Sequence, residues 1–343
     1  MTMESSRQGT ASPPVEAPDR RRPIRSRVAL CCYGIAVALL GAQGVWHLLA
    51  ADRPNPILPP AGEVLRGDAP FRFAVVGDSR GNMEVFEGIC QHIQADDVSL
   101  VLHTGDIVKR CTELQYDWVL HELGEVGFRV PFCAVPGNHD IDESAPDAAS
   151  VRRLYSESFG PPRYWFAYAN TLFVALDNST EKVTAQDLGW LDRTLGLWRR
   201  NYSACLVHMH CPPRDPRPES GHAMHEGAPE LMRVLKRHNV TAVFASHIHT
   251  YLEDEIDGIP IYITGGAGAE RDSPEVPYHY LLCTVDRGGA LTVEKRDVAE
   301  TANADYYEYV LRVKFPYQGV PPLAGVLVAL GMFMDGWQRR KAY

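Results

Sequence analysis

Residues 71–81 read FRFAVVGDSRG, an apolar run that ends in a glycine and an aspartate. The run Phe71–Val76 predicts a buried β-strand, and Asp78 follows its carboxyl end. A carboxylate at the mouth of a hydrophobic strand is costly unless something binds it, although Asp and Gly are also common in turns. Residues 77–81 alone leave both interpretations open, and the motifs downstream decide between them.

Short apolar runs that end in polar residues recur along the chain and alternate with stretches of helical spacing. This alternation predicts a layered α/β fold, in which binding groups gather at the carboxyl ends of the strands. Helices are expected over 82–95, 113–126, 185–199 and 229–238, and further strands over 98–104, 131–135, 164–168, 172–176, 204–208, 242–245 and 259–264.

The polar residues at these strand ends form a set of oxygen and imidazole donors. Such a set is typical of a two-metal site and suits Mn, Fe or Zn. The absence of a paired thiolate argues against a structural zinc cluster. One carboxylate can bridge two ions about 3.5–4 Å apart, which then clamp a phosphoryl group. The residues are Asp78, Asp106, Asn138, His139, His208, His210, His247 and His249.

Taken in order, these motifs resemble those of the calcineurin-like metallophosphoesterases: D-x-H, G-D-x-x-D, G-N-H-D/E, a strand-end His before Pro, and G-H-x-H. The resemblance covers about residues 71–297 and is closest to bacterial, mostly uncharacterised members. It implies a four-layer-type α/β sandwich of mixed β-sheets flanked by helices. It also implies a hydrolase of phosphate esters, monoester or diester, with a dinuclear metal centre and metal-activated hydroxide. The matching residues are 78–80, 105–109, 137–140, 210–212 and 246–249.

The resemblance implies a role for each matching residue. Asp106 would bridge both ions, and His139 would stabilise the transferred phosphoryl group or protonate the leaving oxygen, a role suited to its near-neutral pKa. The other ligands would be Asp78 and His249 for the first ion, and Asn138, His210 and His247 for the second.

Three positions depart from the family's pattern. Arg80 replaces the histidine of the first motif, so the first ion loses a protein ligand; its guanidinium would bind substrate phosphate or form a structural ion pair. Lys109 replaces the acid that would orient His139, and Ser246 replaces a glycine. The alternative function is therefore a catalytically impaired module of the same fold that binds metal or phosphate.

Other histidines near the motifs have weaker signals. The alignment with His-x-Pro favours His210 over His208 as a ligand, which leaves His208 to packing or support. His222 and His225 are expected on a surface loop or near substrate, and His103 in the core or behind the ligands.

The chain has 343 residues and a net charge of −9. This acidic balance argues against a nucleic-acid partner, whereas bound metal ions would still attract a phosphate substrate. The eight cysteines show no regular spacing, and a disulfide is not indicated.

A run without Asp, Glu, Lys or Arg, Val28–Ala51, follows several arginines near the N-terminus. It is longer than the ~20 residues that span a bilayer, and the arginines place the N-terminus in the cytoplasm. A transmembrane signal anchor is predicted, and a cleaved signal peptide ending at Ala50 or Ala51 is the rival. The expected segments are a basic cytoplasmic tail (1–27), the anchor (28–51), a Pro-rich linker (52–70) and the catalytic domain (71–300).

A second uncharged stretch, Phe315–Met334, has aromatic residues near both edges and basic residues after it. These features indicate a second membrane segment over 315–337, or else a helix that docks on the domain or lies in the interface. The expected protein is a single-pass or two-pass membrane protein whose catalytic domain lies outside the cytoplasm, on the periplasmic side if bacterial.

Overall fold

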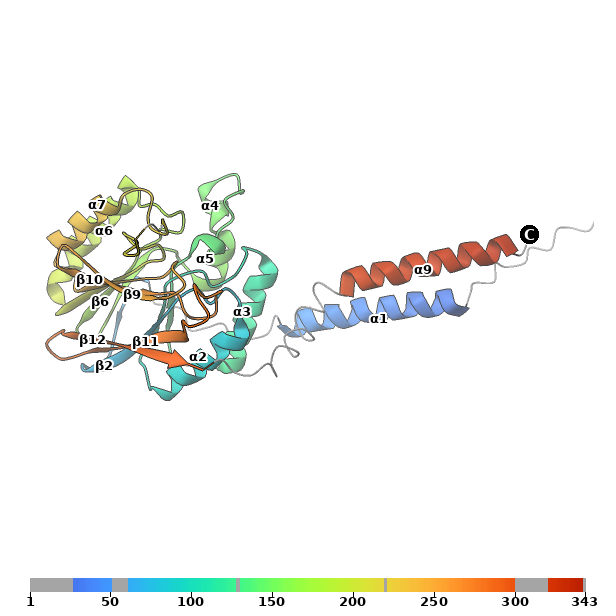
Figure 1. Cartoon of the computed structure of the whole chain (residues 1–343), viewed down its shortest axis with the longest axis horizontal. Coiled ribbons are helices and arrows are strands. Elements are labelled where there is room, and N and C mark those ends of the chain that lie inside the picture. Colours follow the sequence, from blue (N-terminus) through green and yellow to red (C-terminus); the bar gives the residue numbers. More distant parts are fainter. Residues whose placement is uncertain (1–26, 51–60, 128–129, 219–220, 300–319, 342–343) are drawn as a thin grey trace, which may run out of the picture. The chain divides into compact units, whose positions relative to one another are not determined.

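The computed structural model describes residues 27–50, 61–127, 130–218, 221–299 and 320–341. The predicted tail (1–27), apart from Arg27, and the first part of the predicted linker (52–70) lie outside these residues. The described residues belong to two compact units. One contains most of α1 (Arg27–Ala50) and all of α9 (Val320–Lys341), and the other contains the remaining elements (Figure 1).

Helices α1 and α9 lie side by side in the first unit (Figure 1). Gly331 of α9 lies against Tyr33 of α1, because a Cβ added to the glycine would come 2.6 Å from the tyrosine ring. Large apolar side chains point outward instead, with Val37 70% exposed and Phe333 68% exposed. Where side chains of the pair are described, the buried residues are small: Ala29, Cys32 and Ala36 in α1, and Ala324 and Gly331 in α9.

The predicted anchor (28–51) is thus helical in α1, and α9 covers much of the predicted segment 315–337. The side chains of α1 are described as far as residue 42. Among the described residues, no helix is long and apolar enough to cross a membrane.

The second unit is built from two mixed β-sheets. The five-stranded sheet has the order β12 (Leu291–Val298), β11 (Tyr278–Val285), β2 (Phe71–Val76), β3 (Val101–His103), β4 (Phe132–Ala134). The seven-stranded sheet has the order β1 (Val64–Leu65), β5 (Tyr164–Tyr168), β6 (Thr171–Ala175), β7 (Ala204–His208), β8 (Ala242–Ala245), β10 (Ile259–Thr264), β9 (Tyr251–Ile256). Strands β2–β3–β4 run parallel, as do β6–β7–β8–β10, whereas β11 is antiparallel to β2.

The two sheets pack face to face through aromatic residues. Phe73 of β2 contacts Phe173 of β6 and Phe244 of β8, with ring centroids 5.5 and 5.9 Å apart, and all three side chains are buried. Because successive residues of a strand point to opposite faces, Leu172 and Val174 on either side of Phe173 pack into a second core behind the sheet.

Helices cover the outer face of each sheet. On the seven-stranded sheet, α6 (Ala185–Trp198) and α7 (Ala228–Arg237) contribute leucines to the second core. On the five-stranded sheet, α2 (Met83–Ala95) and α5 (Arg153–Phe159) bring Phe86 and Phe159 onto Phe132, and α3 (Glu113–Val126) packs beside both helices. The predicted α/β sandwich of mixed sheets flanked by helices is confirmed. The short helices are α4 (Ala148–Val151), η1 (Asn138–Asp140) and η2 (Arg199–Asn201).

Candidate metal centre

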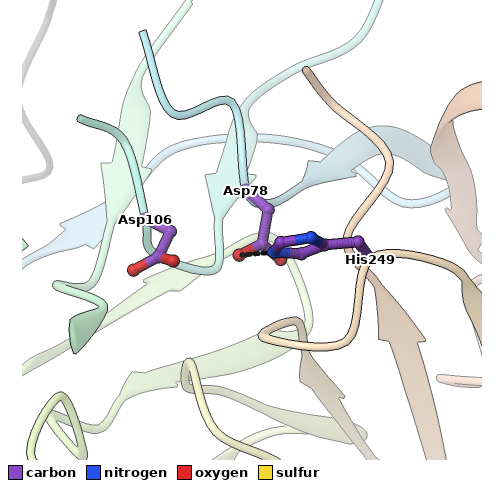
Figure 2. A group of neighbouring side chains, drawn as sticks. All are labelled: Asp78, Asp106 and His249. Atoms are coloured by element: carbon purple, nitrogen blue, oxygen red, sulfur yellow. Dashed lines mark ion pairs between the residues drawn. The ribbon is translucent and has the colours of Figure 1, made fainter. Parts of the chain in front are cut away.

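The polar motifs converge where the carboxyl ends of the parallel strands of both sheets meet. Asp78 follows β2 and Asp106 follows β3, whereas His210 follows β7 and His247 follows β8. Figure 2 shows the side chains of Asp78, Asp106 and His249 turned toward one another. The ends of strands in two different sheets therefore contribute to one site, as expected for ligand sites in α/β folds.

Sharp backbone turns aim these side chains. Asp78, Asp106 and His247 have left-handed conformations with φ of 57°, 56° and 68°, and such conformations cost a non-glycine residue about 1–2 kcal/mol each. Hydrogen bonds between the two aspartate loops offset part of this cost. The Asp78 N–H donates to the Gly105 carbonyl at 3.0 Å, and the Arg80 N–H donates to the Asp106 carbonyl at 2.9 Å.

The first group of acceptor atoms belongs to Asp78, Asp106 and His249, whose ligand atoms lie within 4.8 Å of one another. His249 Nδ1 donates to the Glu270 carbonyl at 2.7 Å, which leaves a lone pair on Nε2. That Nε2 lies 3.8 Å from Asp78 Oδ1, and neither buried atom has a hydrogen-bond partner among the described residues. Burial and the nearby Asp106 raise the pKa of Asp78. Two buried acceptors that face each other unsatisfied fit a cation.

The second group of acceptors surrounds His210. Its Nδ1 lies 3.0 Å from the Thr104 carbonyl oxygen, which can only accept, so Nδ1 donates and Nε2 keeps its lone pair. This Nε2 lies 2.9 Å from Asn138 Oδ1, 3.1 Å from His247 Nδ1 and 3.5 Å from Asp106 Oδ1. Amide and carboxylate oxygens and imidazole nitrogens converge here, a donor set that fits a second cation.

Asp106 lies between the two groups. Its Oδ1 faces His210 and accepts the backbone N–H of His139 at 3.0 Å, while its Oδ2 accepts from the Arg80 guanidinium. Burial by itself would raise the pKa of Asp106, but His210, Arg80 and His139 together lower it to about 2. Asp106 is therefore placed as the carboxylate that both groups share.

Asp140 holds two of the ligand loops together. Its buried carboxylate accepts the backbone N–H groups of Ile107 at 3.1 Å, Val108 at 2.9 Å and Gly137 at 2.8 Å. These bonds connect the loop of Asp106 to the loop after β4, which begins the G-N-H-D motif at Gly137. The sequence places Asp140 in the G-N-H-D motif, but the motif by itself does not give this anchoring role.

Asn178 and Glu181, in the loop after β6, support the second group. Asn178 Oδ1 accepts the backbone N–H of His210 at 2.9 Å, and a Glu181 carboxylate oxygen lies 3.8 Å from Nε2 of His247. A carboxylate beside the far nitrogen of a ligand histidine orients the ring and raises its basicity. Glu181 belongs to none of the motifs, so no sequence signal points to it.

The motifs, in this order along the chain, match one known family. The sequence model described as calcineurin-like phosphoesterase matches residues 71–251. The chain belongs to the calcineurin-like phosphoesterase family. This is a family of phosphoric ester hydrolases, and the resemblance inferred from the motifs is thereby confirmed.

Solved structures share the fold of this phosphoesterase at low sequence identity. A purple acid phosphatase from yellow lupin (Lupinus luteus) is 14% identical with a TM-score of 0.57, over 71% of this chain and 53% of that chain. The match thus spans about half the length of the lupin protein. A dimetal phosphatase from Danio rerio is 15% identical with a TM-score of 0.50, over 67% of this chain and 99% of that chain. No curated protein matches the chain.

In this phosphoesterase a main-chain carbonyl orients His139. Its Nδ1 donates to the carbonyl oxygen of Lys109 at 2.8 Å, and its Nε2 lies 4.0 Å from Asp106 Oδ2. The side chain is 33% exposed, so it can meet a ligand from solvent. Lys109 lacks the acid that the family pattern has at this position, and its backbone oxygen orients the imidazole instead.

The other histidines near the motifs occupy different environments. His208 is fully buried, and its imidazole interacts with the backbone of Cys133 in β4, which fits a packing role. His222 lies beside the centre, with its ring centroid 5.9 Å from that of His247. His225 Nδ1 lies 3.1 Å from the Glu181 carboxylate, close to the support of the second group.

Proposed function

We propose that this phosphoesterase hydrolyses phosphate esters at a centre of two divalent metal ions, Mn, Fe or Zn. The observation that carries the proposal is the pair of buried atoms Asp78 Oδ1 and His249 Nε2. They face each other at 3.8 Å and have no hydrogen-bond partner among the described residues. Asp106 lies between this pair and the second group of acceptors, so one carboxylate would serve both ions. The ligands would be Asp78, Asp106 and His249 for the first ion, and Asp106, Asn138, His210 and His247 for the second.

The residues around the ligands supply positive charge and a proton. Bound metal ions would polarise the phosphoryl group and supply a hydroxide nucleophile at neutral pH. His139, oriented by the Lys109 carbonyl, would carry a proton on Nε2 and donate it to the leaving oxygen. Arg80, whose side chain is 21% exposed, would present its guanidinium to the phosphate oxygens of the substrate.

Metal analysis of the purified chain, followed by assays on a panel of phosphomonoesters and phosphodiesters, tests this proposal. We expect two ions per chain and a hydrolytic activity that a chelator removes and added Mn²⁺ or Zn²⁺ restores. A chain that binds no metal ion contradicts the proposal. Two bound ions without turnover of any ester would favour the alternative, a catalytically impaired metal- or phosphate-binding module.

We further propose that the chain is anchored in a membrane with its catalytic unit outside the cytoplasm. The uncharged run Val28–Ala51 with arginines before it supports a signal anchor. The outward-facing large apolar side chains of α1 and α9 support contact with lipid rather than water. A chain that alkaline carbonate releases from membranes would contradict anchoring. A reporter fused after Tyr343 tests the segment 315–337, because a cytoplasmic signal requires a second span and an extracytoplasmic signal excludes it.

A further inference from the structure

A buried chain of hydrogen bonds connects the two aspartate loops behind their carboxylates. Its central members are His103, the last residue of β3, and Ser79, next to Asp78; neither side chain is exposed. The Gly105 N–H lies 3.2 Å from His103 Nδ1, and His103 Nε2 lies 3.1 Å from Ser79 Oγ. Ser79 Oγ lies 3.2 Å from the carbonyl oxygen of Ile107.

The chemistry of these groups allows one arrangement of hydrogens. A backbone N–H can only donate, so His103 Nδ1 accepts from Gly105, and the single hydrogen of the neutral imidazole is on Nε2. Nε2 therefore donates to the Ser79 oxygen, and the hydroxyl hydrogen is left to donate to the Ile107 carbonyl. Burial lowers the pKa of His103 to about 3, so the ring stays neutral and keeps one donor and one acceptor.

Both ends of this series of hydrogen bonds lie at residues next to the two aspartates, Asp78 and Asp106. Ser79 directly follows Asp78, whereas Gly105 and Ile107 stand on either side of Asp106. Both aspartates have strained left-handed backbones, with φ of 57° and 56°. A hydrogen-bond chain that closes between the two turns restricts how far one carboxylate can move relative to the other.

We propose that Ser79 and His103 are positioning residues that fix the spacing of the Asp78 and Asp106 carboxylates, and thereby the affinity of the centre for its metal ions. This inference rests on the proposed two-metal function. It assigns His103 to the support of the ligands, one of the two roles that the sequence leaves open for it.

Another histidine of the protein, His208, offers a matched control. His208 ends β7 as His103 ends β3, and both imidazoles are fully buried. The imidazole of His208, in contrast, interacts with the backbone of Cys133 in β4, and among the described residues it makes no hydrogen bond to either aspartate loop. Replacing each histidine with phenylalanine removes a buried imidazole in both cases, but only His103→Phe removes a side-chain link between the aspartate loops, whose main-chain hydrogen bonds remain.

The test compares full-length His103→Phe, Ser79→Ala and His208→Phe in titrations with Mn²⁺. A phenylalanine at 103 retains ring packing against Phe86 and Phe132, whose centroids lie 5.8 and 5.5 Å away. We expect the Kd of the weaker-bound ion to rise about 10–100-fold in His103→Phe and Ser79→Ala, the usual effect of losing a group that orients a ligand. The electron paramagnetic resonance signal of a spin-coupled Mn²⁺ pair should weaken in both variants. His208→Phe should keep the wild-type Kd and signal.

Ser79→Ala decides the result if His103→Phe does not fold, because it removes one small hydroxyl. Wild-type affinity and a wild-type coupled signal in Ser79→Ala would overturn the inference. Equal losses in His208→Phe would also overturn it, because general damage to a strand end would then explain them. If the wild-type chain bound none of Mn²⁺, Fe²⁺ and Zn²⁺, the proposed function itself would fail.

Discussion

The guanidinium of Arg80 binds one oxygen of Asp106 with two donors, Nε at 3.1 Å and Nη2 at 2.9 Å. The other oxygen of Asp106 lies 3.5 Å from Nε2 of His210. One half of the shared carboxylate thus already has a positive partner. A metal ion that binds this Oδ2 must compete with the guanidinium for it.

Replacing Arg80 with glutamine should strengthen metal binding and weaken substrate binding. The affinity for the weaker-bound ion should rise because the competing cation is gone. The KM for a phosphate ester should also rise, by roughly 10–100-fold, because a charge-assisted hydrogen bond contributes about 1.5–3 kcal/mol. Mn²⁺ titration and steady-state kinetics measure the two effects. Arg214→Gln is the control, since Arg214 pairs with Asp254 instead. An unchanged KM would show that Arg80 does not bind the substrate phosphate and serves only in its ion pair with Asp106.

His139→Ala should leave the metal content intact and lower turnover roughly 10²–10⁴-fold, the usual contribution of a positioned acid–base group. The backbone N–H that Asp106 accepts is still present in this variant. Metal analysis and kcat on the same preparation separate the two effects. Full activity in His139→Ala would rule out its catalytic role.

Asp106→Asn should remove metal from both groups of ligands, because the charge of one shared carboxylate is lost. Asp78→Asn is the matched control, since Asp78 belongs to the first group only, and it should retain about one ion per chain. Elemental analysis after dialysis gives the two stoichiometries. If both variants kept the same metal content, Asp106 would not be shared.

Glu181→Gln should weaken the second ion through His247. The carboxylate lies 3.8 Å from Nε2 of that histidine, and loss of such a partner usually lowers metal affinity about 10–100-fold. Chelator competition on the variant measures the change. An affinity equal to that of the wild-type chain would show that Glu181 does not support this ligand.

How much of the fold the sequence predicts depends on where each strand lies in its sheet. The apolar runs over Phe71–Val76 and Ala204–His208 predict the interior strands β2 and β7 with the observed bounds. Strands β9 and β12 lie at sheet edges, and many of their side chains face solvent. Their charged residues resemble those of a loop, and only pairing with β10 and β11 makes them strands. A single sequence does not reveal such pairing.

The same limit applies to the candidate site. The motif residues are recognisable because they follow apolar runs, and the structure brings them together at the strand ends. Their metal-binding roles stay predictions. The groups that orient His139 and His249 are the main-chain carbonyls of Lys109 and Glu270, and a main-chain carbonyl has no residue signature. Glu181 reaches His247 only because of how the loop after β6 folds.

Acid should destabilise the folded chain in part through His279. Burial lowers its pKa; its Nδ1 donates to the Pro277 carbonyl at 3.0 Å, and its buried Nε2 has no partner among the residues described. A lowered pKa in the folded state gives stability that is present above the unfolded pKa of about 6.5 and is lost as pH falls. In His279→Phe, the unfolding free energy should therefore fall less steeply below about pH 6.5, by at most about 1.4 kcal/mol per pH unit. Urea unfolding of the metal-free chain at several pH values measures this, and parallel pH curves would contradict it.

Strand β2, which ends two residues before Asp78, is an interior strand only because β11 pairs with it. Val75 pairs with Leu281, 206 positions later in the chain. During synthesis, β2 therefore emerges long before its partner. An unpaired strand edge is a site of aggregation, and pairing over such a separation is slow. A chain that ended between His249 and Tyr278 would contain every predicted ligand and still lack the strand that encloses the first of them. The timing of β11, rather than the supply of ligands, would then decide whether a newly made chain folds or aggregates.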